Sequence, residues 1–123
     1  ISETKELPKG AKIGYDLTET LARNSRLAVC PIGYWHGYPR ALSGIGFVLA
    51  GGKRARILGR VSMDMISIDI TGIKKVKVGD EVVLIGKQGK EEITVAEIAN
   101  LADTSHYEIV TRLNPLMKRI YLC

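Results

Sequence analysis

The side chains that could do chemistry gather in residues 30–69, in loops between short apolar runs. Trp35, the only tryptophan of the chain, follows Tyr34 in a loop at 33–40, and a Ser-Met-Asp sequence lies at 62–64. Three arginines stand beside apolar runs of the same stretch: Arg40, Arg56 and Arg60. Amphipathic rings prefer one apolar and one polar contact, so the aromatic loop either plugs one end of a barrel or lines a pocket. We expect binding chemistry in these loops.

The chain offers few groups for nucleophilic or metal chemistry. Its two histidines, His36 and His106, have no spacing that suggests a Ser-His-Asp or Cys-His pairing, and His36 has no second metal ligand nearby. Cys30 and Cys123 show no zinc pattern, so we expect free thiols in a reducing compartment. There is also no phosphate loop and no dinucleotide fingerprint. We therefore predict no metal site.

Length and composition indicate one domain. The chain has 123 residues, of which 46% are hydrophobic, and no window approaches the roughly 18–20 apolar residues of a membrane helix. No signal peptide opens the chain and its first residue is Ile1, so we expect that a larger protein is missing its N-terminal part. The net charge of +5 permits an anionic partner. Because lysines and aromatic residues occupy different segments, a phosphate or a carboxylate is as plausible a partner as nucleic acid.

Alternating and continuous apolar runs predict strands at 1–6, 27–32, 46–50, 53–60, 65–73, 81–85 and 117–122. A capping box at Thr94–Glu97 opens a helix over 94–102, and a second box at Ser105–Glu108 opens another over 106–113. We predict an all-β fold, a closed Greek-key-like β-barrel of six to eight short strands with two short helices near the C-terminus. From the residues alone, we expect Tyr15 to be half-exposed, with its ring covering the core. We expect Tyr107 either to pack between the two helices or to bind an anion at the start of the second helix.

Five motifs in order resemble the C-terminal domain of alanine racemase: GYDLT at 14–18, PIGYWHGYPR at 31–40, GRVSMDM at 59–65, VGDEVVLIG at 78–86 and TSHYEIVTRL at 104–113. The likeness covers essentially the whole chain, residues 1–123. In that family a domain like this one follows an N-terminal TIM barrel, absent here, which carries pyridoxal 5'-phosphate on a lysine. The resemblance implies a cytoplasmic racemase of L- and D-alanine, an isomerase that makes D-alanine for peptidoglycan precursors and acts as a head-to-tail homodimer.

The resemblance also implies roles for individual residues. Tyr15 matches the tyrosine that reaches into the partner subunit's active site and moves the α-proton on one face of the substrate. Tyr34 matches a tyrosine at the inner gate of the substrate corridor, and Arg40 and Arg60 match arginines that line its outer part. These arginines would attract the substrate carboxylate.

Three further positions follow from the resemblance. Met63 matches the residue whose backbone N–H helps to hold the substrate carboxylate, and Asp64 would shape the same turn. Tyr107 matches a tyrosine that hydrogen-bonds the cofactor phosphate. Two positions in the loop depart from the family pattern, because His36 stands where aspartate is usual and Trp35 where a small residue is common. These departures leave the shape of the entrance open.

Without the barrel lysine we expect the isolated domain to be inactive. Serine or broad-specificity racemases share the two-domain plan and stay alternatives. So do a basic β-barrel module that binds nucleic acid and a structural dimerisation domain whose tyrosines are buried. The β-domain of the basic amino-acid decarboxylases fits less well, because its Cys and Asp motifs are not found. We favour the interpretation as an alanine racemase domain, which predicts neither nucleic acid nor a membrane as a partner.

Overall fold

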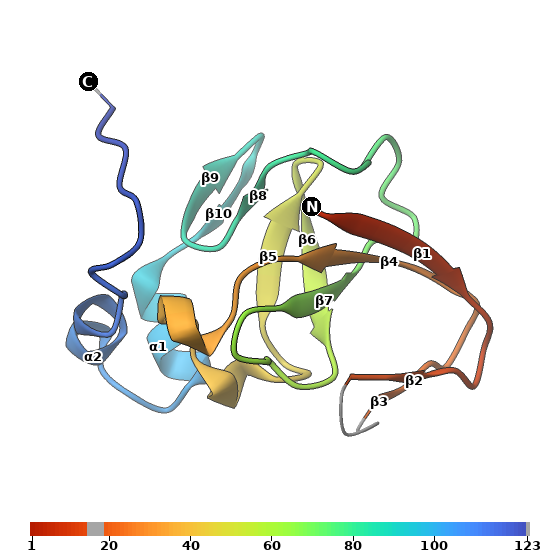
Figure 1. The fold of residues 1–123 in the computed structure, drawn as a ribbon, viewed down its shortest axis with the longest axis horizontal. Coiled ribbons are helices and arrows are strands. Elements are labelled where there is room, and N and C mark those ends of the chain that lie inside the picture. The colour runs from red at the N-terminus through yellow and green to blue at the C-terminus, as the bar shows by residue number, and fades with distance from the viewer. Residues whose placement is uncertain (15–18, 123) are drawn as a thin grey trace.

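The computed structural model describes residues 1–14 and 19–122. Six strands form one curled antiparallel sheet, in the order β1-β4-β7-β6-β5-β8 (Figure 1). Their bounds are β1 Glu3–Leu7, β4 Ser25–Cys30, β5 Phe47–Ala50, β6 Lys53–Leu58, β7 Ile66–Asp69 and β8 Val82–Val83. The chain is mostly β, as the sequence predicts.

Two small hairpins and four short helices complete the described part of the chain. The hairpins pair β2 (Lys12–Ile13) with β3 (Glu19–Thr20) and β9 (Gly86–Gln88) with β10 (Glu91–Ile93). The helices are η1 (Tyr34–His36), η2 (Arg40–Leu42), α1 (Val95–Leu101) and α2 (His106–Thr111). Thr94 and Ser105 cap α1 and α2 by accepting the amides of the residues three positions on, so both predicted helix starts are confirmed. The reciprocal bond of a capping box, from the glutamate side chain to the N–H of the cap residue, does not occur among the hydrogen bonds of the described residues.

Strand β4, which lies between β1 and β7, is buried on both faces, which explains its continuous apolar sequence. Ala28 and Cys30 face the main core, which lies between the sheet and the helices. Leu27 and Val29 face a second, smaller cluster that includes Leu58 of β6. Successive side chains of a strand point to opposite faces, so each face of β4 needs its own apolar cover.

The Cys30 thiol lies in the main core and is not part of a disulfide. Burial raises its pKa to about 11, so the thiolate needed for nucleophilic chemistry is scarce at neutral pH. Cys123 lies outside the described residues. No helix within residues 1–14 and 19–122 is long and apolar enough to cross a membrane.

A closed barrel is not confirmed. Within the described residues the sheet ends at β1 on one side and β8 on the other, and these strands do not pair. Two backbone hydrogen bonds of 2.9 Å join Ile1 to Gly79 and Asp80, the turn that precedes β8, so the two edges approach without forming a ladder. The result is a half-barrel.

The strand predicted at 117–122 is wrong. This segment leaves the fold as an extended arm beyond α2 and has no sheet partner among the described residues (Figure 1). Ile120, Tyr121 and Leu122 are 73%, 84% and 91% exposed. A strand needs a neighbouring strand for its amides and carbonyls, and the described chain offers none at this place.

One ion-pair network ties α1 to the sheet. The guanidinium of Arg54 on β6 donates to both carboxylate oxygens of Glu97 at 2.7 and 2.8 Å and to the Glu92 carbonyl at 2.7 Å. The hydrogen bond from Arg54 lowers the pKa of Glu97 below its ordinary value. This pair therefore stabilises the fold fully above the pKa of an unfolded glutamate, and the contribution is lost as the pH falls through the lower folded value.

We predict that Glu97→Gln lowers the free energy of unfolding at pH 7 by about 1 kcal/mol or less, because both side chains are partly exposed. At pH 3 the difference from wild type should shrink, since the wild-type carboxylate is then losing its charge. Urea unfolding at the two pH values measures this. An equal difference at both would contradict the assigned role of the pair.

Candidate functional site

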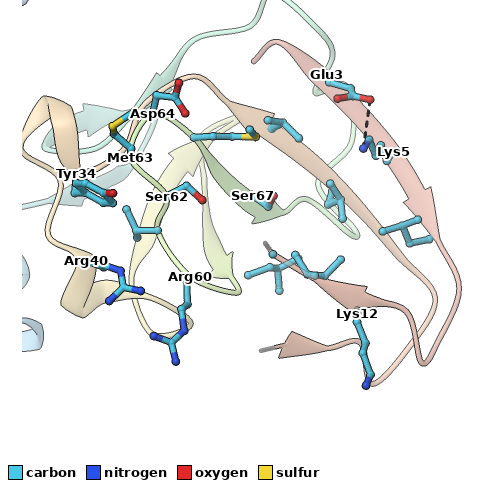
Figure 2. A pocket seen from close by; sticks show the side chains of 18 residues that line it. Glu3, Lys5, Lys12, Tyr34, Arg40, Arg60, Ser62, Met63, Asp64 and Ser67 are labelled. Atoms are coloured by element: carbon cyan, nitrogen blue, oxygen red, sulfur yellow. Dashed lines mark ion pairs between the residues drawn. The ribbon is translucent and has the colours of Figure 1, made fainter. Parts of the chain in front are cut away.

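A cleft of about 900 Å³ lies on the face of the sheet opposite the main core. Leu27 and Val29 of β4 form part of its floor, β1 and β2 form one wall, and the segment 60–65 between β6 and β7 forms the other (Figure 2). Its charged lining is mainly cationic, with four bases and two carboxylates: Lys5, Lys12, Arg40, Arg60, Glu3 and Asp64. Such a lining favours an anionic ligand.

The cleft brings together five of the seven residues singled out from the sequence. Arg40 and Arg60 lie at one end, and Tyr34 lies beside Met63 and Asp64 at the other end of the same wall (Figure 2). Tyr34 is 48% exposed and Met63 is 53% exposed, so both are open to a ligand.

The other two residues are not part of the described cleft. Tyr107 lies in the first turn of α2, as predicted, but does not line the cleft and is 71% exposed, which excludes packing between the helices. Tyr15 falls outside the described residues. Gly14, the described residue that precedes it, lines the cleft.

The aromatic loop at 33–40, which follows β4, contributes residues to both the cleft and the main core. Tyr34 lines the cleft, whereas Tyr38 is buried against Leu42 in the main core. Its hydroxyl has no hydrogen-bond partner among the described residues, and burial raises the pKa of Tyr38 well above its ordinary value. Tyr38 is therefore a core residue, and only the first part of the loop faces a ligand.

The loop and the 60–65 segment are joined backbone to backbone. The Tyr34 N–H donates to the Ser62 carbonyl at 3.0 Å and the Trp35 N–H donates to the Met63 carbonyl at 2.8 Å. A Cβ atom at Gly33 would lie 2.1 Å from the Ser62 oxygen, so only glycine fits there. This contact fixes Tyr34 relative to Met63.

Both carbonyls are turned toward the loop, and three of the four amides in the 62–65 turn, those of Met63, Asp64 and Met65, donate to no acceptor among the described residues. The Ser62 N–H closes the turn by donating to the Met65 carbonyl at 3.0 Å. Among residues 1–14 and 19–122, the Met63 N–H has no hydrogen-bond acceptor. A backbone donor at the rim of a cationic cleft can receive a carboxylate oxygen.

The far side of the same loop is held by the residues that follow α2. A Cβ at Gly37, whose φ is 105°, would lie 2.5 Å from the Arg112 carbonyl oxygen. Asn114 donates through its side-chain amide to the Trp35 carbonyl at 2.8 Å and through its backbone N–H to the His36 carbonyl at 3.1 Å. The loop is thus clamped between the 60–65 segment and the end of α2.

A single hydroxyl links the backbones beside the two arginines. Ser43 Oγ donates to the Arg40 carbonyl at 2.6 Å and accepts the Val61 N–H at 2.8 Å. Val61 is the neighbour of Arg60, so the bridge couples η2 to the other cleft wall. Sequence reasoning did not single out Ser43 or Asn114 as site residues, because neither residue type is distinctive outside its fold.

Arg56, the third arginine of the stretch, has a structural role. Its guanidinium donates to a Glu19 carboxylate oxygen and to the Gly44 carbonyl, both at 2.8 Å, and it does not line the cleft. No cluster of three or more His, Cys, Asp or Glu side chains that could hold a metal ion occurs among the described residues.

Comparison with known proteins identifies the family. The family described as "Alanine racemase, C-terminal domain" matches residues 1–121. The chain belongs to this family. An alanine racemase from Halothermothrix orenii is 50% identical over 117 residues, which are 95% of this chain and 31% of that protein.

Two further relatives bear on substrate and cofactor. A lysine racemase from Proteus mirabilis is 46% identical over 102 residues, which are 83% of this chain and 25% of that protein. The structure of alanine racemase from Bartonella henselae with covalently bound pyridoxal phosphate matches with a TM-score of 0.88 at 35% identity, covering 97% of this chain and 32% of that one. The alanine racemase C-terminal domain described here thus spans about a third or less of the length of these relatives.

We predict that Gly33→Ala destabilises the chain by about 1–3 kcal/mol, because the added methyl group forces the loop away from Ser62. The emission of Trp35, the only tryptophan, should shift as the loop moves. Urea unfolding and fluorescence measure the two effects. Gly72→Ala is the control for the emission: its Cβ would meet nothing within 4 Å, so alanine there strains only the local backbone, whose φ is 79°. It should leave the Trp35 emission unchanged. Unchanged emission in Gly33→Ala would contradict the assigned contact.

Proposed function

We propose that this domain belongs to a pyridoxal-phosphate-dependent racemase that interconverts L- and D-alanine. The observation that carries the proposal is the convergence of Tyr34, Arg40, Arg60, Met63 and Asp64 on one cationic cleft in a member of this family. The cleft has the charge and the backbone donor that an amino-acid carboxylate requires.

Each residue of the cleft then has a task in binding. Arg40 and Arg60 attract the carboxylate into the outer cleft. Tyr34 narrows the inner part, and the Met63 N–H donates to a carboxylate oxygen, so the side chain of residue 63 matters less than its amide. Asp64 shapes the turn that presents this amide.

Racemisation needs a proton removed from one face of the α-carbon and another delivered to the opposite face. We assign one face of the substrate to Tyr15, acting in the partner subunit's site, and the opposite face to a lysine of the N-terminal TIM barrel; the two groups exchange tasks when the reaction starts from the other enantiomer. A phenol has a pKa of about 10, so Tyr15 requires neighbouring donors or cations that favour its phenolate. Gly14 lines the cleft, which supports a role for the next residue there.

Pyridoxal phosphate, when bound, withdraws electron density from the α-carbon after its proton leaves. The alanine racemase from Bartonella henselae holds this cofactor covalently bound. In the present chain the exposed phenol of Tyr107 could donate to its phosphate, and most of the binding site would come from the barrel domain. The chain's own contribution is therefore to hold the substrate and to move a proton.

The apolar arm after α2 supports packing against a further domain or subunit. Leu116, Ile120, Tyr121 and Leu122 are all at least 73% exposed, although the family match extends to residue 121. Exposed apolar side chains in one segment mark a contact surface. We propose that this surface packs against the N-terminal barrel or against the second subunit of a homodimer.

We also propose that the parent protein lies in the cytoplasm, where the Cys30 thiol stays reduced.

A racemase of broader specificity is the second candidate, because one relative is named a lysine racemase and another, from Enterococcus faecalis, an amino-acid racemase. Assays of the full-length parent with alanine, serine and lysine discriminate between the two. Turnover of alanine far above the others supports the first proposal, and comparable rates support the second.

We predict that Tyr15→Phe in the full-length parent lowers alanine turnover by roughly two to four orders of magnitude in both directions, because the phenolic proton carrier is lost. The assay starts separately from L- and D-alanine and monitors cofactor absorbance. Tyr38→Phe is the matched control: it removes a buried hydroxyl without a described partner, so its activity should equal that of the wild type. Wild-type turnover by Tyr15→Phe, or racemisation by the isolated domain, would contradict the assignment.

A further inference from the structure

The side chain of His36 turns back onto its own helical turn. Its Nδ1 accepts the Gly33 N–H at 3.0 Å, while the His36 N–H donates to the Gly33 carbonyl at 3.0 Å. Gly33 is buried, and no other described residue accepts its amide proton. The imidazole therefore satisfies a buried backbone donor that water reaches poorly.

This hydrogen bond determines which tautomer the neutral His36 ring adopts. Since Nδ1 accepts a hydrogen bond, the neutral imidazole carries its proton on Nε2. The ring of Trp35 meets it edge to face, with centroids 4.9 Å apart and an interplanar angle of 80°. The function proposed above gives His36 no role.

The next two backbone amides of the same turn connect the aromatic loop to the 60–65 segment of the cleft wall. They belong to Tyr34 and Trp35 and donate to the carbonyls of Ser62 and Met63. The Gly33–His36 bond thus closes the turn that keeps Tyr34 in place. It also orients the peptide unit that carries the Met63 N–H, because the Ser62 carbonyl belongs to that unit, and the peptide unit that follows it. Without an acceptor at residue 36, the Gly33 amide must turn toward solvent, which breaks the close approach to Ser62.

We infer that His36 is a positioning residue for the substrate: through Gly33, its Nδ1 aligns the Met63 amide and Tyr34 with the carboxylate of the bound amino acid. The inference rests on the proposed function. What the site requires is a hydrogen-bond acceptor two bonds from Cβ, and an imidazole as such is not needed. Asparagine places Oδ1 at the same bond distance from Cβ as histidine places Nδ1, whereas phenylalanine keeps a ring and offers no acceptor.

The test compares His36→Phe and His36→Asn in the full-length parent with pyridoxal phosphate bound. For His36→Phe we expect the KM for alanine to rise about tenfold with a smaller change in kcat, the size expected when a buried amide loses its acceptor. His36→Asn should return KM to within about twofold of wild type. A loss of ring packing alone would instead affect asparagine more than phenylalanine.

Hydrogen exchange of the peptide covering residues 31–38 gives a readout that needs no activity. Exchange should be faster in His36→Phe and close to wild type in His36→Asn. If the wild type does not racemise alanine while the exchange pattern holds, the proposed function fails and the positioning of the loop stands. Wild-type KM in His36→Phe, or KM values that rise equally in both variants, would overturn the inference.

Discussion

The site depends on one close backbone contact, that of Gly33 with Ser62 and Met63. Gly33 has no room for a methyl group, and its contact with Ser62 joins two loops that are almost 30 residues apart in the chain. The two hydrogen bonds beside it hold Tyr34 and the Met63 turn in one arrangement. Because both partners are backbone atoms, the contact survives changes in most of the surrounding side chains.

The register of the sheet makes this contact possible. β4 and β7 are antiparallel neighbours, and Cys30 at the end of β4 pairs with Ile66 at the start of β7. The chain therefore leaves one strand and enters the other at the same edge of the sheet, and the loops at 31–38 and 60–65 must meet there. The apolar cover on both faces of β4 keeps this edge rigid, so the cleft is built on a fixed frame.

Much of the frame follows from local sequence patterns. The alternation in β7 and the sequences that begin the two helices at Thr94 and Ser105 act over a few residues, and each predicted its element. The patterns fail where an element needs a neighbour that the described residues do not provide. The segment at 117–122 has the composition of a strand, but no strand of the described residues lies beside it.

The site could be predicted only in part, for a similar reason. The arginines and tyrosines were recognisable by type and motif, and five of the seven residues meet in the cleft. Ser43, Asn114 and the imidazole of His36 act through backbone groups that are distant in sequence or hidden in a turn, and residue type alone does not predict such bonds.

In the proposed site, the turn held by Gly33 presents the Met63 amide to a substrate carboxylate. A crystal structure of the full-length parent with its cofactor and propionate, which has the carboxylate of alanine but no amino group, tests this arrangement. We expect a carboxylate oxygen at about 2.7–3.2 Å from the Met63 nitrogen, on the cleft side of Tyr34. A propionate bound elsewhere, with the Met63 N–H directed at another protein group, would contradict it.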